Sequence, residues 1–133
     1  MYNDKTVLIV EDSITIRFQI KMMLEEIGVK LKEAGGEIGL FNLIEEYGQK
    51  VDLIIMDLTL KTENGLDLIK KLREHSAYKE IPIIILTEHA DANHVLAAKE
   101  LGVEDYIRKP INKDLIVERV TNLLMQSMEK QMI

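Results

Sequence analysis

The sequence predicts one α/β domain in which helices cover both faces of a doubly wound parallel sheet. Five predicted strands, three of them short apolar runs, alternate with five amphipathic segments, an order typical of parallel strands joined by helices. The runs near the middle of the chain are continuously apolar, as expected of strands buried on both faces. A length of 133 residues suits a single domain with a sizeable core. We therefore predict a (βα)5 fold with a five-stranded sheet.

The first predicted strand and helix lie within residues 6–28. The run TVLIV at 6–10 is typical of a short buried strand, and it ends in the adjacent acids Glu11 and Asp12. Ser13 is suited to cap the N-terminus of a helix that ends at Gly28. The side of this helix that faces the sheet is expected to carry Ile16, Ile20, Met23, Leu24 and Ile27.

The second and third strands are predicted at 29–34 and 51–57. The second is more polar, so we expect it at or near an edge of the sheet. The helix between them, after Gly36, is expected to use Ile38, Leu40, Phe41, Leu43 and Ile44 as its apolar face. The third strand ends in Asp57. Ligands bind outside the carboxyl ends of such strands, so Asp57 is a candidate for chemistry, although acids also commonly begin a loop.

The second half of the chain contains the last two predicted strands. The fourth strand is predicted at 81–86, followed by Thr87, and the fifth at 105–108, followed by Lys109-Pro110. The helix before the fourth strand begins at Gly65 and has the apolar residues Leu66, Leu68, Ile69 and Leu72. The next helix stops at Gly102 and has Val95, Leu96, Ala98 and Leu101, and the last runs from about 112 past 124 with Ile116, Val120, Leu123 and Leu124. We assign residues 1–125 to the domain. Residues 126–133 either extend the last helix or begin a linker.

Composition excludes several classes of protein. Cysteine is absent, which excludes disulfides, thiolate metal sites and cysteine nucleophiles. The formal net charge of -6 argues against a nucleic-acid-binding surface, which depends on Lys and Arg. No apolar run is long enough to cross a bilayer and the start has no signal-peptide pattern. We therefore expect no membrane contact and a cytoplasmic location.

Polar side chains follow four of the predicted strands: Glu11-Asp12, Asp57, Thr87 and Lys109. If these strands are parallel neighbours, the side chains open onto one crevice. Three carboxylates at close range raise one another's pKa values unless a cation lies among them, and oxygen ligands without His or Cys suit Mg²⁺. Lys109 offers a charge and Thr87 a hydroxyl to a phosphoryl oxygen. Together these groups predict phosphoryl transfer to an aspartate.

With these residues the chain resembles the receiver domain of bacterial two-component response regulators along nearly its whole length. The matching positions are Glu11-Asp12, Asp57, Gly65, Thr87, Tyr106 and Lys109-Pro110. The resemblance implies a flavodoxin-like receiver fold with strand order 2-1-3-4-5. It also implies that Asp57 accepts a phosphoryl group from a histidine kinase or a phosphotransfer protein, so that the protein acts as a signalling switch.

The resemblance also implies a metal site. Asp12, Asp57 and the backbone carbonyl of Thr59 would bind Mg²⁺, with Glu11 assisting through water. Lys109 would serve the transfer with Asp57 and Thr87. The protein would catalyse its own phosphorylation and dephosphorylation, and we expect no turnover of a separate substrate.

The implied output is a conformational change. Thr87 and Tyr106 would move together and alter the surface around the fourth helix, the fifth strand and the fifth helix, and the Lys109-Pro110 peptide would be cis. The partner would be a downstream effector protein or a fused output domain, with phosphorylation-dependent homodimers as a further option. No output domain follows in this sequence, so we expect either a free-standing regulator or a receiver cut from a longer chain.

Three positions depart from the commonest family pattern, and two related classes are excluded. Glu11 replaces the usual Asp, Lys61 occupies a loop position where proline is frequent, and Glu88 follows Thr87 where a small residue is usual.

A flavin-binding protein of this topology would not begin its phosphate loop with two acids. A phosphatase with an Asp nucleophile would need a second Asp where this chain has Thr59. The alternative that stays open is a receiver-like interaction module that is not phosphorylated.

The first predicted helix has an additional apolar row. Ile14, Phe18 and Met22 recur at a spacing of four, outside the face already assigned to the sheet. Such a row beside the predicted site suggests a docking patch for the phosphodonor protein. The alternative is a rotated helix that buries these side chains.

Overall fold

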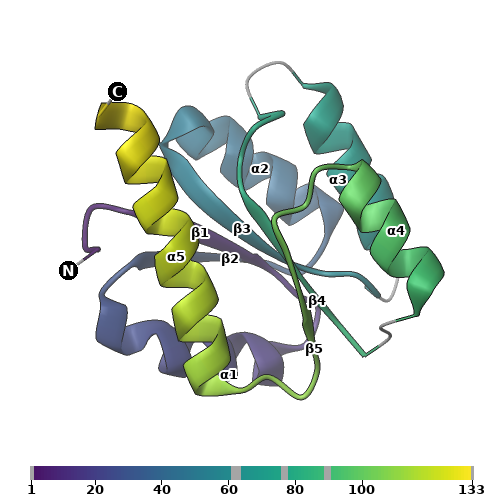
Figure 1. Ribbon diagram of the computed structural model, residues 1–133, viewed down its shortest axis with the longest axis horizontal. Helices are drawn as coiled ribbons and strands as arrows, with labels where there is room; N and C mark the ends of the chain where they lie inside the picture. Colours follow the sequence, from purple (N-terminus) through teal and green to yellow (C-terminus); the bar gives the residue numbers. More distant parts are fainter. Residues whose placement is uncertain (1, 61–63, 76–77, 89–90, 133) are drawn as a thin grey trace.

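The structure is a computed structural model that describes residues 2–60, 64–75, 78–88 and 91–132. The described residues form a parallel sheet of five strands with α-helices on both faces (Figure 1). The strand order β2-β1-β3-β4-β5 confirms the predicted fold class. The strands are β1 (Thr6–Val10), β2 (Lys30–Ala34), β3 (Val51–Asp57), β4 (Ile83–Thr87) and β5 (Asp105–Arg108), and the α-helices are α1 (Ile14–Leu24), α2 (Glu37–Tyr47), α3 (Gly65–Glu74), α4 (Ala92–Glu100) and α5 (Lys113–Met132).

The strand register determines which residues meet at the carboxyl edge of the sheet. The last residue of β1 pairs with Met56 on β3, so Glu11 and Asp57 leave the sheet side by side. Thr87 ends β4, which is the neighbour of β3 on its other side. Lys109 follows the last residue of β5, the neighbour of β4. The polar residues predicted at the strand ends therefore reach one edge of the sheet.

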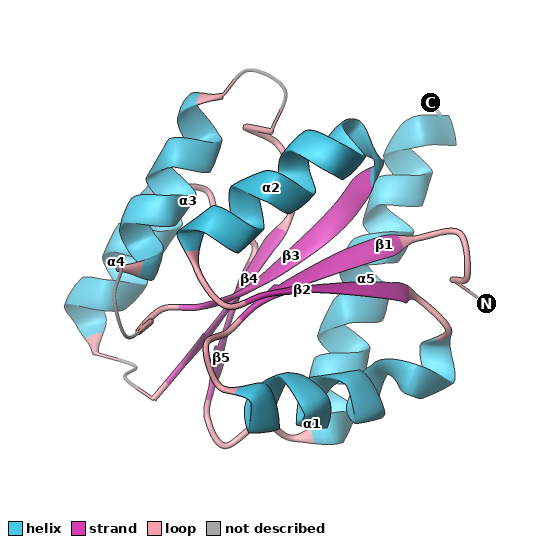
Figure 2. Cartoon of the chain, turned by 180° about the vertical axis from the view of Figure 1, so that it is seen from behind, coloured by secondary structure: helices cyan, strands magenta, loops and turns pink. Residues whose placement is uncertain are grey.

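The hydrophobic core has two parts, one on each face of the sheet. Helices α1 and α5 cover one face, and α2, α3 and α4 cover the other (Figures 1 and 2). Alternate residues of β1 serve the two parts, with Val7 and Ile9 on the α1/α5 side and Leu8 and Val10 on the other. Every residue of β1 is buried, as its continuous apolar run predicts. The more polar β2 lies at an edge of the sheet, also as predicted.

The start and end of the first helical segment agree with the cap residues. Ser13 Oγ accepts a hydrogen bond from the Ile16 N–H (3.2 Å) and caps α1. A single 3₁₀ turn (Glu25–Ile27) follows α1, and Gly28 ends the segment with φ 77°, a left-handed conformation that suits glycine. At the other end of the chain, α5 continues to Met132. None of the described helices is both long enough and apolar enough to cross a bilayer.

Two predicted core residues and two strand boundaries differ from the structure, the second strand beginning at Lys30 rather than at 29. Ile38 is 79% exposed and Leu96 is 57% exposed. Each precedes a buried residue of its helix, Leu40 or Ala98, by two positions, and this spacing rotates a side chain by about 200° around a helix. The fourth strand begins at Ile83 rather than at 81. The intervening Pro82 has no N–H for the ladder, although its carbonyl still accepts from β3.

Candidate functional site

The carboxyl edge of the sheet gathers three carboxylates from two strands. Glu11, Asp12 and Asp57 each offer an oxygen, and these oxygens all lie within 4.8 Å of one another. Glu11 and Asp57 are buried, with 1% and 3% of their surfaces exposed, whereas Asp12 is half-buried. Like charges at this range oppose ionisation. The cluster therefore requires nearby positive charge.

Lys109 supplies that charge from the end of β5. Its Nζ lies 3.3 Å from Asp57 Oδ2 and 3.4 Å from Glu11 Oε2, and its side chain is 12% exposed. The other oxygen of Asp57, Oδ1, accepts a hydrogen bond from the Thr59 N–H (3.0 Å). Glu11 Oε1 accepts from the Ser13 N–H (3.4 Å). The structure thus fixes both oxygens of the two buried carboxylates with donors from three segments.

One cation does not balance the cluster. The pKa of Glu11 is raised to about 7, first by burial and then by the hydrogen bond and the charge of Asp57, while Lys109 acts in the opposite direction. Burial and the charge of Asp57 therefore favour the protonated form of Glu11. A divalent cation among the carboxylates would remove this penalty, and a donor set of oxygens alone suits Mg²⁺. The residues present fit the ion that the sequence predicts.

The fourth predicted Mg²⁺ ligand is the backbone carbonyl of Thr59. The structure places Thr59 two residues beyond Asp57 with an exposed side chain and its N–H directed to the Asp57 carboxylate. No contact in the structure tests the role of its carbonyl, which stays a prediction.

Gly65 allows the loop after Asp57 to close against the end of β3. A Cβ at Gly65 would lie 2.5 Å from the backbone oxygen of Asp57 and 2.9 Å from atoms of Leu58, distances that no side chain tolerates. The Gly65 N–H donates to the Leu58 carbonyl (2.9 Å), and Asn64 caps α3 through the Leu66 N–H. Glycine is therefore required here. Lys61, the predicted departure in this loop, lies outside the described residues.

The two predicted switch residues are in contact. Thr87 is fully buried at the end of β4, and its side chain shares a hydrogen bond with Tyr106 on β5. Tyr106 is half-buried against the α2–α4 side of the core. Burial raises the pKa of Tyr106, and the hydrogen bond with Thr87 acts against this shift. The structure thus links the site edge to β5 through one side-chain contact.

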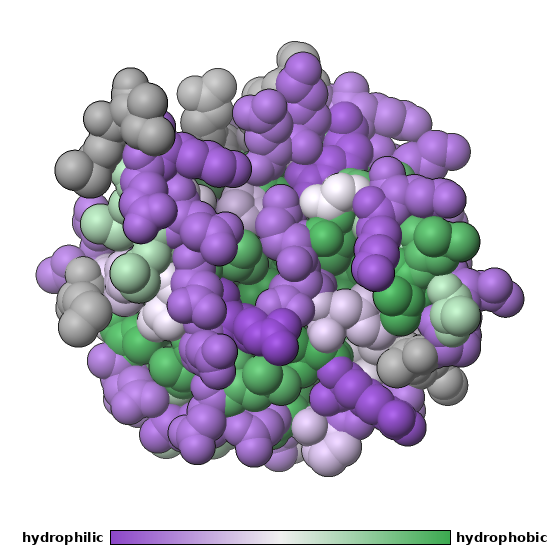
Figure 3. Space-filling model, viewed as in Figure 1, coloured by the Kyte–Doolittle hydropathy of each residue, from purple (hydrophilic) through white to green (hydrophobic). Residues whose placement is uncertain are grey.

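A hollow of about 350 Å³ adjoins the carboxylate cluster. It is lined by Ile16, Glu88, Lys109, Pro110 and Ile111. The Lys109-Pro110 peptide is cis, as predicted. Figure 3 shows apolar side chains grouped low in the view, in the region where Figure 1 shows the β5–α5 connection. Glu88 is exposed and lines the same hollow as Lys109, so its charge lies on an approach to the site.

The additional apolar row on α1 is exposed. Ile14, Phe18 and Met22 are 73%, 60% and 54% exposed. The helix is therefore not rotated to bury them, and that alternative is wrong. Ile14 follows the cap residue Ser13, so the row begins next to the acidic cluster.

Arg17 also belongs to the site, although it is not among the residues predicted from the sequence. Arg17 Nη1 donates to the Glu11 backbone oxygen (2.6 Å), and Nε lies 3.3 Å from Glu33 Oε1 on β2. The sequence feature that could have predicted this contact is a cationic residue one turn beyond a helix cap, because helical side chains point back toward the N-terminus of the helix.

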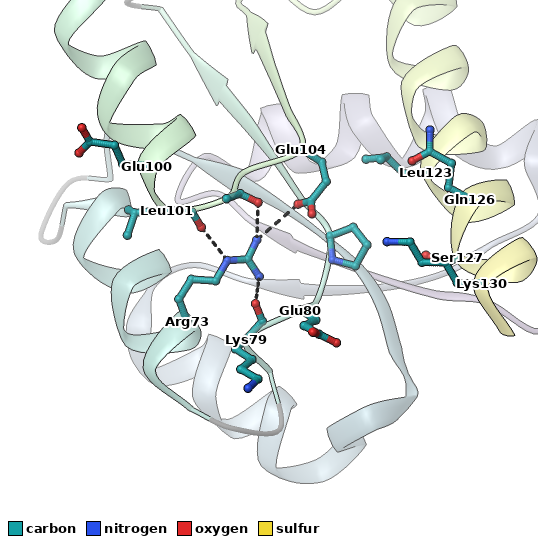
Figure 4. Close-up of a pocket in the computed structure, with 12 residues that line it drawn as sticks. Arg73, Lys79, Glu80, Glu100, Leu101, Glu104, Leu123, Gln126, Ser127 and Lys130 are labelled. Carbon is teal, nitrogen blue, oxygen red and sulfur yellow. Dashed lines mark hydrogen bonds and ion pairs between the residues drawn. The ribbon is translucent and has the colours of Figure 1, made fainter. Parts of the chain in front are cut away.

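A larger hollow of about 820 Å³ lies at the opposite edge of the sheet, near the starts of β4 and β5 (Figure 4). There the Arg73 guanidinium donates to the backbone carbonyls of Lys79, Ile81, Leu101 and Gly102 and pairs with Glu104. Arg73 thus joins the end of α3 to the end of α4 and to the segment before β4. With its donors used in this way, Arg73 has a structural role, and the hollow is separate from the carboxylate cluster.

Comparisons with known proteins agree with this geometry. The family model for the response regulator receiver domain matches residues 7–121. The chain is 34% identical to the chemotaxis protein CheY1 of Helicobacter pylori over 118 residues, which cover 88% of this chain and 94% of that protein. It is 33% identical to the phosphate regulon transcriptional regulatory protein PhoB of Pseudomonas aeruginosa over 120 residues, which cover 90% of this chain and 52% of PhoB.

Solved structures show the same similarity. The chemotaxis protein CheY4 of Vibrio cholerae matches with a TM-score of 0.82 and 25% identity, over 90% of this chain and 98% of that one. A response regulator from Thermotoga maritima matches with a TM-score of 0.80 and 27% identity, over 91% and 98% of the two chains.

Proposed function

Because this chain belongs to the response regulator receiver domain family of two-component systems, we propose that it is a signalling switch phosphorylated on Asp57. One observation carries the proposal. Asp57 is a buried carboxylate at the end of the central strand, within 3.3 Å of Lys109 and next to the oxygens of Glu11 and Asp12. A buried nucleophile with a cation and a metal-binding acid pair at its side suits phosphoryl transfer, which depends on positioning and charge neutralisation.

The proposed reaction transfers a phosphoryl group from a phosphohistidine. An oxygen of Asp57 attacks the phosphorus, a P–O bond forms as the donor P–N bond breaks, and the histidine leaves with that electron pair. When bound, Mg²⁺ supplies positive charge to the carboxylates and the phosphoryl oxygens. Lys109 neutralises negative charge where the phosphoryl group joins Asp57. The Thr59 N–H orients the nucleophile through its bond to Oδ1.

The proposed switch begins at Thr87. Its hydroxyl has one proton, so donating it to a phosphoryl oxygen would change its hydrogen bond with Tyr106. A hollow of about 160 Å³ between α4 and β5, lined by Val95, Ala98, Val103 and Tyr106, leaves room for the ring to shift. The surface of α4, β5 and α5 would then change, and a downstream effector or output domain would recognise the result.

We further propose that the phosphodonor docks on the Ile14, Phe18 and Met22 row. These exposed side chains begin beside the acidic cluster, and the apolar hollow with Ile16 and Ile111 lies next to the same site. A helix of a histidine kinase or phosphotransfer protein packed there would hold its phosphohistidine over Asp57.

Mass spectrometry tests the acceptor. Incubated with Mg²⁺ and an acyl phosphate, the protein should gain one base-labile phosphoryl group, and Asp57→Asn should gain none while keeping the fold. A phosphorylated Asp57→Asn variant would place the acceptor elsewhere. No gain in the parent protein would favour the alternative, an interaction module that is not phosphorylated.

A further inference from the structure

Arg17 joins three segments that surround the acidic cluster. Its Nη1 donates to the backbone oxygen of Glu11 at 2.6 Å, at the end of β1. Its Nε lies 3.3 Å from Glu33 Oε1 on β2. The same Nη1 lies 3.4 Å from the position that a Cβ on Gly35 would occupy, so the guanidinium also packs against the turn after β2. The side chain is only 17% exposed.

These contacts hold the backbone of Glu11 on both sides. The Glu11 N–H donates to the Ala34 carbonyl (3.0 Å), and the Glu11 carbonyl accepts from Arg17. With both backbone groups bonded, the backbone position from which the Glu11 side chain extends toward Lys109 is held. The bonded carbonyl belongs to the peptide that continues into Asp12. Arg17 thus contacts the peptide that links the two acidic residues.

The position of the Glu11 backbone matters more than it would for an aspartate at the same place. An additional methylene gives Glu one more rotatable bond than Asp, and that freedom must be restricted for its oxygens to meet those of Asp12 and Asp57. The Ser13 N–H restrains one oxygen at 3.4 Å and Lys109 the other at 3.4 Å. Both restraints depend on where the backbone of Glu11 lies.

We propose that Arg17 is a positioning residue of the Mg²⁺ site, which it supports by fixing the Glu11-Asp12 peptide against β2. This inference rests on the proposed function, in which the acidic cluster binds Mg²⁺. Charge alone predicts the opposite effect, because removal of a cation near the site would strengthen the binding of a second cation. The sign of the change in Mg²⁺ affinity therefore separates the two roles.

The chain offers a matched control for the charge. Lys21 lies on the same helix, and its Nζ is 3.1 Å from Glu33 Oε2, so it shares the β2 partner of Arg17 without bonding to Glu11. Arg17→Gln should weaken Mg²⁺ binding about tenfold, the low end for loss of an outer-shell partner. Lys21→Gln should leave the affinity unchanged or slightly stronger. The affinities are measured by Mg²⁺ titration of backbone amide NMR spectra, which also report whether each variant is folded.

Arg17→Lys provides a second test if Arg17→Gln does not fold. A lysine keeps the charge, but as a point donor it cannot hold the Glu11 carbonyl and Glu33 together. Mg²⁺ binding weaker than in the parent protein supports the proposal, and unchanged or stronger binding in the folded Arg17 variants overturns it. If the parent protein itself shows no Mg²⁺ response, the proposed metal site fails, and that result is distinct from a loss confined to the Arg17 variants.

Discussion

Glu11 determines how the stability of the site depends on pH. Its pKa is about 7 in the folded protein against 4.5 for an unperturbed Glu, because of burial and Asp57. Between these values the folded protein keeps a proton that the unfolded chain loses. Protons bound preferentially by the folded state stabilise it, and this contribution is complete below pH 4.5 and lost as the pH rises through 7.

We therefore predict that the metal-free protein loses stability, on the order of 2 kcal/mol, as the pH rises from about 5 to about 7.5. The measurement is the free energy of unfolding by urea in buffer with a chelator. Glu11→Gln, which cannot ionise, should flatten the profile over this range. An equal slope in the parent protein and in Glu11→Gln would assign the effect to another group.

Glu88 is predicted to slow small anionic phosphodonors. Its exposed side chain lines the hollow next to Lys109, where its charge repels an incoming acyl phosphate. Glu88→Ala should speed phosphorylation by such a donor about threefold at low ionic strength, and added salt should reduce the difference. Glu100→Ala at the far end of α4 is the control, because it removes the same charge beside the other hollow. Equal rates for Glu88→Ala and the parent protein would contradict the prediction.

The sequence predicts residues at strand ends better than residues that act through packing. Asp57 and Thr87 can be found because each lies at the end of an apolar run, and Lys109 because it follows the next predicted strand; parallel strands bring their carboxyl ends together. Arg17 could not be found in this way. Its place one turn beyond the helix cap is a weak local signal, because its contact with Glu11 also depends on the angle at which α1 crosses the end of the sheet, which the sequence pattern does not encode.

At the scale of elements, α1 combines the cap next to the site with the exposed apolar row. Periodicity predicts that such a helix exists, and its cap and C-terminal glycine predict where it lies. Periodicity is less informative about helices with apolar residues on several sides. On α2 and α4 it did not separate the buried Leu40 and Ala98 from the exposed Ile38 and Leu96.

The apolar row on α1 leads to a prediction about phosphotransfer from a protein donor. Phe18→Ala should slow phosphotransfer from the protein donor about tenfold, because the exposed aromatic ring at the centre of the row is lost from the contact. Phosphorylation by an acyl phosphate should stay unchanged, since Phe18 touches none of the reacting groups. Ile38→Ala, an exposed apolar residue on a helix of the other face, should affect neither rate. Loss of both activities in Phe18→Ala would indicate a role in folding and exclude docking.

At the scale of the whole molecule, the two edges of the sheet differ in how far their charged groups are neutralised. The carboxyl edge holds three acids around Lys109, and their repulsion lowers stability until a cation binds. At the other edge the Arg73 guanidinium is satisfied by four backbone carbonyls and Glu104 (Figure 4). One edge is therefore adapted to bind a ligand, and the other maintains the arrangement of α3, α4 and β4.

This contrast gives the last prediction. Mg²⁺ at ten times its dissociation constant should stabilise the parent protein by about 1.4 kcal/mol, because it binds the folded cluster and not the dispersed chain. Asp57→Asn should raise the metal-free stability, since one like charge is removed, and should remove most of the Mg²⁺ increment. Arg73→Met should lower stability by about 2 kcal/mol, because several carbonyls lose their donor, yet keep the full increment. The stabilities of all three proteins are measured by thermal and urea unfolding, each with and without Mg²⁺. An increment that survives in Asp57→Asn, or disappears in Arg73→Met, would show that the ion binds elsewhere or that the two edges are coupled.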